Sequence, residues 1–323
     1  MKRIPRGTPV AFEQPDGKFR PLLILDYLSS GGQADVYTAC DPKNRNELYC
    51  VKYLCGAFFA KNDVRGSAGK PRNGPCLPSA QDTRRKLTVL AKNRDMFPAP
   101  FVMPLGVSEV YDGGGLMYYM PYLKGYVKTS PIIISPDKYS ARMKTELARA
   151  IAGAFRSLSE MGYHYGDISD GNILYKFVGS EIDVKIIDAE GILPEGLPVA
   201  TVEGTGYYRA PEVIAGAQPS IQSDVHAFSV LAFRMFMSKH PLETKECREM
   251  TPDSDSFLRF FCRDPRFIFS EDEKARVPAA VRKRWAALPT NLRLYFAANF
   301  SPKALTRQVD RLDYAEFLRL SAQ

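Results

Sequence analysis

Several residues of this chain have types and spacing that suit phosphate chemistry. Small residues fill the segment 28–37 (LSSGGQADVY), where backbone amides could approach a phosphate chain without interference from side chains. Lys52 follows in an apolar run and could neutralise phosphate charge. Asn172 and Asp188 each border an apolar run, and amide and carboxylate oxygens are ligands that Mg²⁺ prefers. Each signal is weak alone, because small-residue hairpins and solvated lysines are common.

In the first half of the chain, the elements that would have to position these groups are predicted to be strands. Four runs rich in Val, Ile, Leu, Tyr and Phe predict strands at Pro21–Tyr27, Leu48–Leu54, Phe101–Val110 and Leu116–Leu123. Asp112-Gly113-Gly114-Gly115 predicts a hairpin turn between the last two. The segment 56–78 is rich in Gly, Pro, Asn and Lys and predicts a long surface loop.

The second half changes to a helical pattern. Apolar residues at three- and four-residue spacing predict a helix from Ala141 to Met161, which Gly162 ends. Short strands are expected at Ile173–Phe177 and Val184–Asp188. Further helices are expected at Val225–Met237, Arg282–Phe300 and Leu312–Leu320, the first buried because it is apolar nearly all round.

Five segments in one order carry a resemblance to a known family. They are 28–37, 49–52 (YCVK), 165–174 (YGDISDGNIL), 184–190 (VKIIDAE) and 204–212 (GTGYYRAPE), the last followed by 223–228 (SDVHAF). They resemble the Gly-rich loop, V-A-I-K strand, catalytic loop, D-F-G segment and A-P-E end of eukaryotic-type (Hanks-type) protein kinases. The catalytic loop resembles that of divergent bacterial members. The resemblance implies an α+β fold with two lobes, a β-rich N-terminal lobe at 1–123 and a helical C-terminal lobe at 124–323, which together form one kinase domain.

The resemblance also implies ATP and Mg²⁺ (or Mn²⁺) as cofactors and assigns catalytic roles. Asp167 would accept or orient the substrate hydroxyl proton, and Lys52 would hold the α- and β-phosphates. Asn172 and Asp188 would ligate the metal. Residues 120–123 resemble the hinge that binds the adenine edge, so the expected nucleotide-binding set is Ser29, Gly31, Gly32, Ala34, Val36, Cys50, Lys52, Met120, Pro121 and Leu123.

The end of the activation segment implies two structural contacts. Asp224 would brace the backbone of the catalytic loop, and Glu212 would pair with Arg311. The stretch from Ile192 to Val202 is then the activation loop, with Thr201 a candidate phosphosite.

Four departures from the family pattern bear on activity. Tyr165-Gly166 replaces His-Arg, Ser169 stands where a lysine steadies the transferring phosphoryl group, and Ala189-Glu190 replaces Phe-Gly. The helix expected at Ser79–Lys92 contains no glutamate to pair with Lys52. Alignment puts Lys86 at that position and leaves Asp82 as the one acidic residue that could substitute. Either the helix is shifted, or Lys52 finds another partner, or the enzyme is weak.

Composition places the chain among ordinary globular proteins. It has 323 residues, 45% hydrophobic and 25% charged, and its six cysteines lack the spacing of a zinc site. The net charge of +8 is spread along the chain, which argues against a nucleic-acid partner. No apolar run is long enough for a membrane span, and reduced thiols are typical of a cytoplasmic protein.

Three functions remain open at this level. The leading hypothesis is a serine/threonine protein kinase that acts on a protein substrate, the chain itself included. The missing glutamate and Ser169 favour a pseudokinase that serves as a nucleotide-binding scaffold, whereas the retained Lys52, Asp167, Asn172 and Asp188 oppose it. A small-molecule kinase is the third, since such enzymes share the G-D-x-x-x-x-N loop but lack the segment at 204–212.

Overall fold

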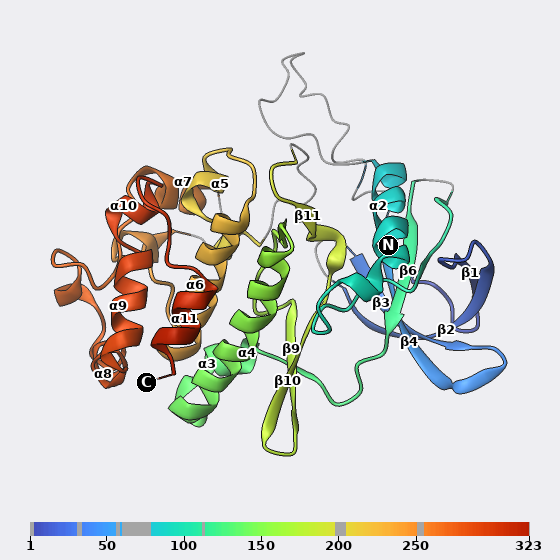
Figure 1. Cartoon of the computed structure of the whole chain (residues 1–323), viewed down its shortest axis with the longest axis horizontal. Coiled ribbons are helices and arrows are strands. Elements are labelled where there is room, and N and C mark those ends of the chain that lie inside the picture. Colours follow the sequence, from blue (N-terminus) through green and yellow to red (C-terminus); the bar gives the residue numbers. More distant parts are fainter. Residues whose placement is uncertain are drawn as a thin grey trace, which may run out of the picture. The chain divides into compact units, whose positions relative to one another are not determined.

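The computed structural model describes residues 3–30, 34–55, 59, 79–111, 114–197, 205–250 and 255–322. The described residues contain both strands and helices and form two compact units (Figure 1). The first unit comprises the described residues of Met1–Tyr126 together with Ile187–Glu190. The second comprises those of Val127–Ile186, Gly191–Pro198 and Val202–Gln323.

The first unit is built on an antiparallel sheet. Its strands lie in the order β1-β2-β3-β4-β6-β5. Helix α2 accompanies the sheet, and Ser79 caps its start by accepting a hydrogen bond from the backbone N–H of Asp82. The bounds of these elements are β1 Pro9–Glu13, β2 Phe19–Ser30, β3 Ala34–Asp41, β4 Asn44–Leu54, α2 Ala80–Lys92, η1 Arg94–Met96, β5 Gly106–Val107 and β6 Leu116–Pro121.

The alternation of side chains along β4 divides the core of the first unit in two. Tyr49 and Val51 point into one apolar cluster with Phe12, Tyr37 and Tyr119. Cys50 and Leu54 belong to a second cluster, which also contains Leu87 of α2. Because successive side chains of a strand face opposite sides, Lys52 must share the face of Cys50 and Leu54. The strand pattern therefore delivers one lysine to an otherwise apolar face.

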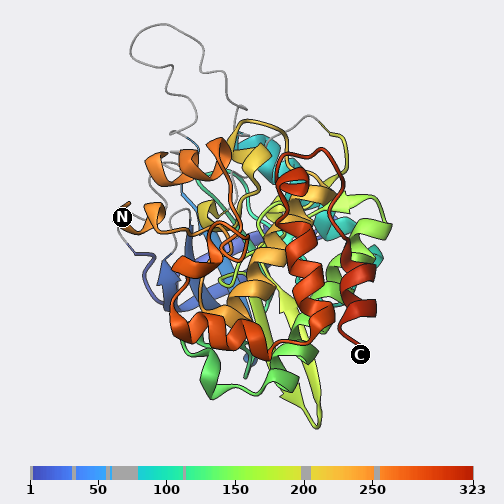
Figure 2. The same cartoon turned by 90° about the vertical axis from the view of Figure 1, so that its left-hand side faces the viewer.

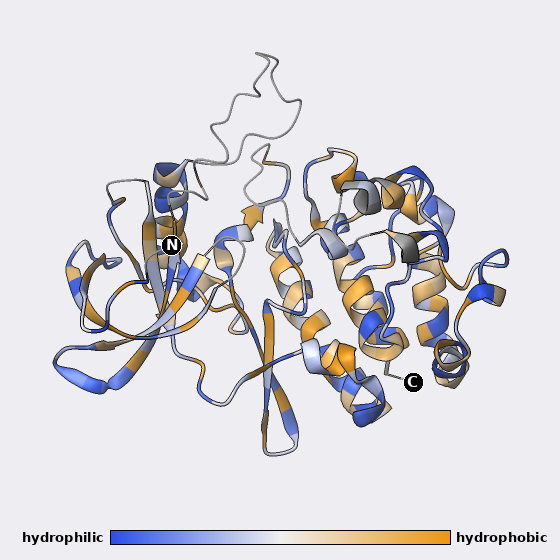
Figure 3. Ribbon diagram, turned by 180° about the vertical axis from the view of Figure 1, so that it is seen from behind, coloured by the Kyte–Doolittle hydropathy of each residue, from blue (hydrophilic) through white to orange (hydrophobic). Residues whose placement is uncertain are grey.

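The second unit is mainly helical. Helix α6 (Ile221–Met237) is buried along most of its length and begins with a capping box between Ser220 and Ser223. Helices α4 (Ala141–Glu160), α9 (Thr290–Asn299) and α11 (Tyr314–Leu320) pack around it; in Figure 2, α9 and α11 are the orange to red helices and α4 is green. Apolar and polar residues share these helices (orange and blue in Figure 3), which is typical of amphipathic elements around a core.

Smaller elements complete the second unit. Strands β7, β9 and β10 form one sheet, and β8 pairs with β11. The remaining bounds are β7 Val127–Lys128, α3 Ser130–Ile134, η2 Pro136–Lys138, β8 Tyr163–His164, β9 Ile173–Val178, β10 Glu181–Ile186, η3 Ala189–Gly191 (which straddles the two units), β11 Leu193–Pro194, η4 Gly206–Tyr208, α5 Pro211–Ile214, η5 Glu246–Glu249, α7 Asp255–Arg263, η6 Lys274–Arg276, α8 Ala279–Ala287 and α10 Pro302–Leu305.

Some predicted elements were wrong. The single helix predicted for Arg282–Phe300 is two helices, α8 and α9, because Pro289 cannot donate a helical hydrogen bond and disfavours helical backbone at Leu288. The strand predicted for Phe101–Val110 is reduced to β5, after Pro104. Strand β1 and helix α7 were not predicted.

Other predictions fall on parts of the chain that are not described. These are most of the loop predicted at 56–78 and the hairpin-turn residues Asp112 and Gly113. Within the described residues, no helix combines the length and the apolar character that crossing a membrane requires.

Candidate active site

Lys52 is the centre of a charged group in the first unit. Its ammonium lies 2.9 Å from Asp188 Oδ2 and 2.6 Å from Glu190 Oε1. Asp188 and Glu190 follow directly after β10, in the short segment that belongs to the first unit. The backbone of Asp188 is left-handed, with a φ of 67°, a conformation that aspartate tolerates better than most residues. The side chain of Lys52 is only 11% exposed, so the two carboxylates are what compensate its charge.

Burial and pairing oppose each other in this group. Burial favours the neutral form of Lys52, but Asp188 and Glu190 outweigh that effect and raise the pKa of Lys52 above its usual value. Burial likewise favours the neutral form of Glu190, but Lys52 outweighs it and the pKa of Glu190 is lowered. Both groups are therefore charged near neutral pH.

A second lysine reaches the same segment from α2. Lys86 Nζ donates a hydrogen bond to the backbone carbonyl of Glu190. Burial lowers the pKa of Lys86 to about 7, although the carboxylate of Glu190 opposes the shift. Asp82 is exposed, and its carboxylate contacts Ser79 and Arg85 at the start of α2. The suggestion that Asp82 pairs with Lys52 is therefore wrong.

Several residues of the predicted nucleotide set lie together. Ala34 and Met120 are buried in one apolar cluster, and Cys50 and Leu123 pack against it with Ile187. Val36 of β3 stands opposite Lys52 of β4, Ser29 lies near the end of β2, and Pro121 ends β6. Gly31 and Gly32 are outside the described residues.

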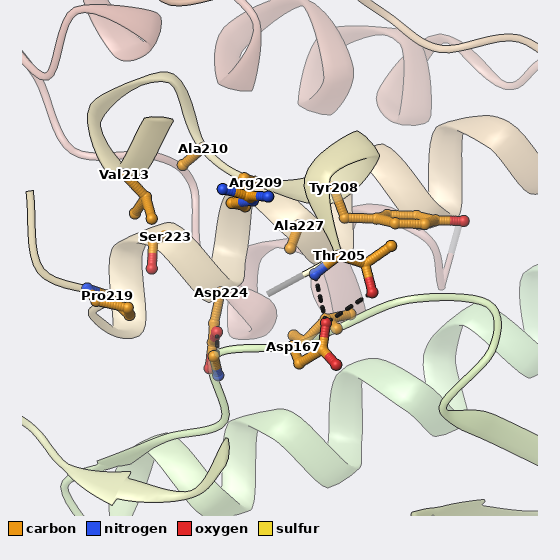
Figure 4. Close-up of a pocket in the computed structure, with 12 residues that line it drawn as sticks. Asp167, Thr205, Tyr208, Arg209, Ala210, Val213, Pro219, Ser223, Asp224 and Ala227 are labelled. Atoms are coloured by element: carbon orange, nitrogen blue, oxygen red, sulfur yellow. Dashed lines mark hydrogen bonds between the residues drawn. The ribbon is translucent and has the colours of Figure 1, made fainter. Parts of the chain in front are cut away.

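Asp167 is the hub of a hydrogen-bond network in the second unit (Figure 4). Its Oδ2 accepts a hydrogen bond of 2.8 Å from the side-chain amide of Asn172. Its Oδ1 accepts two from Thr205, from the backbone N–H at 2.6 Å and from the hydroxyl at 2.8 Å. Thr205 follows directly after residues that are not described, and Asn172 immediately precedes β9. The network fixes the carboxylate between two segments far apart in the sequence.

Asp224 holds the backbone of the loop that carries Asp167. Its carboxylate accepts hydrogen bonds from the backbone N–H groups of Tyr165 and Gly166, the latter at 2.9 Å. Burial raises the pKa of Asp224 to about 7, although the two N–H groups oppose the shift. Helix α6 presents Asp224 in its first turn, so the helix core and the loop are joined by one carboxylate. The predicted bracing contact is confirmed.

The segment after Thr205 is anchored at two further points. Arg311 forms the predicted ion pair with Glu212. The pair is bidentate, with N–O distances of 2.6 and 2.8 Å. The hydroxyl of Tyr208 donates a 2.6 Å hydrogen bond to Asp170, three residues after Asp167. Arg234 of α6 stacks on the ring of Tyr208. This segment is thereby held against both α6 and the loop of Asp167.

Comparison with known families agrees with this geometry. The family model described as "Protein kinase domain" matches residues 110–289, more than half of the 323-residue chain. The chain belongs to the protein kinase family. Membership implies the use of ATP and a divalent metal in general, and the resemblance to Hanks-type kinases found in the sequence is confirmed.

Curated relatives of this kinase domain carry kinase names at low identity. It is 25% identical over 260 residues to serine/threonine-protein kinase PknD of Chlamydia pneumoniae, covering 71% of this chain and 25% of that protein. It is 24% identical over 242 residues to protein kinase C-like 2 of Schizosaccharomyces pombe, covering 70% and 20%. A third match, to serine/threonine-protein kinase pak-1 of Caenorhabditis elegans, is 25% identical over 237 residues and covers 72% and 36%. The chain thus spans between a fifth and about a third of these relatives.

The predicted metal ligands of the kinase domain have suitable chemistry. The amide nitrogen of Asn172 donates hydrogen bonds to the carboxylate and the backbone carbonyl of Asp167. Its amide oxygen takes part in neither bond and is a hard ligand of the kind that Mg²⁺ prefers. Asp188 offers a carboxylate on a left-handed backbone. Asn172 belongs to the second unit and Asp188 to the first, so their joint metal site stays a prediction.

Sequence reasoning missed Glu190, which the structure places against the predicted phosphate-binding lysine. The residue had been noted only as a replacement in the D-F-G segment. Two features of the sequence together could have indicated it. Glu190 is a carboxylate two residues after Asp188, and the predicted helix has lysine where the family has glutamate. Thr201, the candidate phosphosite, lies outside the described residues.

Proposed function

We propose that the chain transfers the γ-phosphoryl group of Mg-ATP to serine or threonine hydroxyls of proteins, its own included. In this proposal the β-rich N-terminal lobe (1–123) binds the nucleotide and the helical C-terminal lobe (124–323) binds the protein substrate. The two lobes act as one kinase domain. The low identity to relatives named serine/threonine-protein kinases is consistent with this specificity.

The observation that carries the proposal is the arrangement around Asp167. Its carboxylate is held by Asn172 on one oxygen and by Thr205 on the other, so its position is fixed. The hydroxyl of Thr205 donates a 2.8 Å hydrogen bond to Asp167, so this carboxylate accepts from an aliphatic hydroxyl, as the proposed reaction requires. In the proposed reaction Asp167 accepts the acceptor's proton as the hydroxyl oxygen bonds to the γ-phosphorus. The bond from that phosphorus to the bridging oxygen of ADP breaks.

The phosphate end of the reaction is assigned to the first unit. Lys52 would hold the α- and β-phosphates, and the cluster of Ala34, Cys50, Met120 and Leu123 would contact the adenine. Asn172 and Asp188 would hold Mg²⁺ or Mn²⁺, which when bound neutralises phosphate charge. These roles follow from the family resemblance and the chemistry of the side chains.

One observation favours a nucleotide-binding scaffold instead. Ser169 is buried, only 3% exposed, at the position where the family resemblance expects a lysine that steadies the transferring phosphoryl group. A buried serine brings no charge to that group. Transfer would then be slow or absent, while nucleotide binding through Lys52 would remain.

The test is a comparison of the native chain with Asp167→Asn. Each is incubated with Mg²⁺ and γ-labelled ATP, with and without a generic basic protein, and phosphoamino acids are then separated. We expect label on serine or threonine with the native chain and a loss of about 10²- to 10⁴-fold with Asp167→Asn. Asp264→Asn, which changes an exposed carboxylate of the same unit, is the control and should retain activity.

Three other outcomes would change the conclusion. Equal label from the native chain and Asp167→Asn would remove the proposed role of that carboxylate. No label, with a rise in melting temperature on addition of Mg-ADP, would establish the scaffold. No label and no nucleotide binding would overturn both functions.

A further inference from the structure

The geometry around Lys52 raises the question of which carboxylate holds it when the nucleotide is bound. Two are in contact, Asp188 at 2.9 Å and Glu190 at 2.6 Å. In the proposed function Asp188 is a metal ligand, and an oxygen that serves a metal is a weaker partner for an ammonium group. Glu190 is not a proposed metal ligand. It also makes the shorter of the two contacts.

Helix α2 does not offer an alternative carboxylate. Its one acidic residue, Asp82, lies in the first turn, is exposed and contacts Ser79 and Arg85. One turn later the helix has Lys86, which is basic and offers no carboxylate. The ammonium of Lys52 therefore depends on the segment after β10 rather than on the helix.

Lys86 reinforces this arrangement from the helix side. Its ammonium donates a hydrogen bond to the backbone carbonyl of Glu190, while the side chain of Glu190 reaches Lys52. One residue is thus held by its backbone to α2 and by its side chain to β4. Such a fixed carboxylate can hold a flexible lysine side chain in one orientation.

The surroundings make the charge of Glu190 effective. Its side chain is 14% exposed and that of Lys52 11%, so water screens their attraction little. Without Glu190, the buried ammonium of Lys52 would keep only the longer contact with Asp188, and losing a partner of a largely buried charge is costly. A neutral residue at position 190 should therefore alter the behaviour of Lys52 more than the change in shape would suggest.

We propose that Glu190 is the positioning residue for Lys52: it holds the ammonium toward the nucleotide phosphates, and Lys86 fixes its backbone to α2. This inference rests on the proposed function of Lys52 in binding ATP. It has a structural consequence: because Glu190 and Asp188 lie in one short segment, the same segment places the partner of Lys52 and the proposed metal ligand. The ion pair then forms without any carboxylate from α2.

The first arm of the test measures kinetics and binding in Glu190→Gln. We expect the KM for ATP to rise and kcat to fall, with kcat/KM lower by about 10- to 100-fold, the range of a lost charged hydrogen bond. Calorimetry with Mg-ADP should show a parallel loss of affinity. A merely structural role would instead reduce the active fraction, so kcat would fall while the KM for ATP and the ADP affinity of the folded protein stayed native.

A matched control is Glu13→Gln. Glu13 also belongs to the first unit and makes a 2.6 Å ion pair, but its partner is Arg84 rather than Lys52. This variant should keep native kcat, KM and ADP affinity. If Glu190→Gln changes these quantities no more than Glu13→Gln does, the proposal is overturned.

The second arm needs no nucleotide. Melting temperatures of Lys52→Met, Glu190→Gln and the double variant form a cycle. We expect the double variant to melt higher than Lys52→Met alone, because one of the two carboxylates that lose Lys52 is then neutral. Strict additivity would overturn the pairing. An inactive native chain that binds no ADP would defeat the proposed function. Native activity with an unaffected Glu190→Gln would defeat this inference alone.

Discussion

Asp224 of the second unit and Glu190 of the first are both carboxylates removed from water, yet their pKa values move in opposite directions. Burial raises the pKa of Asp224 to about 7, because its partners are two neutral backbone N–H groups. The pKa of Glu190 is lowered, because Lys52 brings a full positive charge that outweighs the same burial effect. A cation compensates a buried charge, whereas two hydrogen bonds compensate it only in part.

The difference suits the work of each unit in the proposed kinase. Asp224 contacts backbone of the loop that carries Asp167 and so fixes its shape without adding a cation there. Glu190 contacts a side chain that is proposed to meet phosphate, and the pair keeps Lys52 protonated. One carboxylate orders a loop, and the other maintains a charge.

The largest effect on stability is expected where a cation-held carboxylate loses its cation. In the second unit Glu212 is paired with Arg311, whose side chain is fully buried. Arg311→Met should lower the free energy of unfolding by about 3–5 kcal/mol, since Glu212, whose side chain is 18% exposed, would keep only the longer 3.8 Å contact with Arg307. Urea denaturation measures this change. The control is Arg319→Met, which removes an exposed pair with Glu316 and should cost less than about 1 kcal/mol.

Equal losses in Arg311→Met and Arg319→Met would show that burial does not decide the strength of these pairs. The comparison between Asp224 and Glu190 would then lose its basis. A double variant, Arg311→Met with Glu212→Gln, should recover part of the loss, because no uncompensated charge remains.

A smaller effect is expected from the titration of Asp224. Its folded pKa of about 7 lies above the ordinary value of 3.8, so between these pH values the folded chain holds a proton that the unfolded chain has released. This group therefore lowers stability as the pH rises through that window, by up to about 1.4 kcal/mol per pH unit, and its contribution is constant above pH 7. Burial is the main cause, and the nearby charges of Glu195 and Asp167 act in the same direction.

Asp224→Asn isolates this contribution because it cannot ionise. The free energy of unfolding is measured in urea for the native chain and the variant at intervals from pH 4 to pH 8. The value for the native chain minus the value for the variant should fall as the pH rises to 7. The variant also loses one acceptor for a backbone N–H, a cost that does not depend on pH. A difference that stays flat across the window would show that the two N–H groups keep the pKa of Asp224 near its ordinary value.

The sequence allowed more of the second-unit site to be predicted than of the first. Asp167 and Asn172 are five residues apart in one turn, so their contact is largely local. Asp224 and Arg311 were assigned by motif, and both contacts are present. The partner of Lys52 is 138 residues away, and the family pattern directs attention to a helix instead. Long-range pairing between two segments leaves no periodic signal in the sequence, and the motif that contains Glu190 assigns no pairing role to that position.

The same distinction applies to the fold. The change from strands to helices was visible because apolar spacing is a local property, and helix α4 was placed within one residue of its observed end. The long helix predicted for Arg282–Phe300 failed because its apolar residues kept a helical pattern across Pro289. There the local backbone chemistry of proline overrode the periodicity. A proline within a stretch of helical periodicity therefore ends the helix even where the apolar spacing continues.

The smallest effect is expected at the carboxylate that sequence alone suggested for Lys52. Asp82 is exposed, lies 3.4 Å from Arg85 and contacts the capping Ser79. Asp82→Asn keeps a residue that tolerates the first helical turn, so stability should change by no more than about 0.5 kcal/mol and phosphoryl transfer should stay native. Side-by-side kinetics of Asp82→Asn and Glu190→Gln would decide between the two carboxylates. A loss of activity in Asp82→Asn alone would show that Asp82 of helix α2, not Glu190, is the partner of Lys52. An exposed charge that stayed in water would be too strongly screened to act on the buried ammonium.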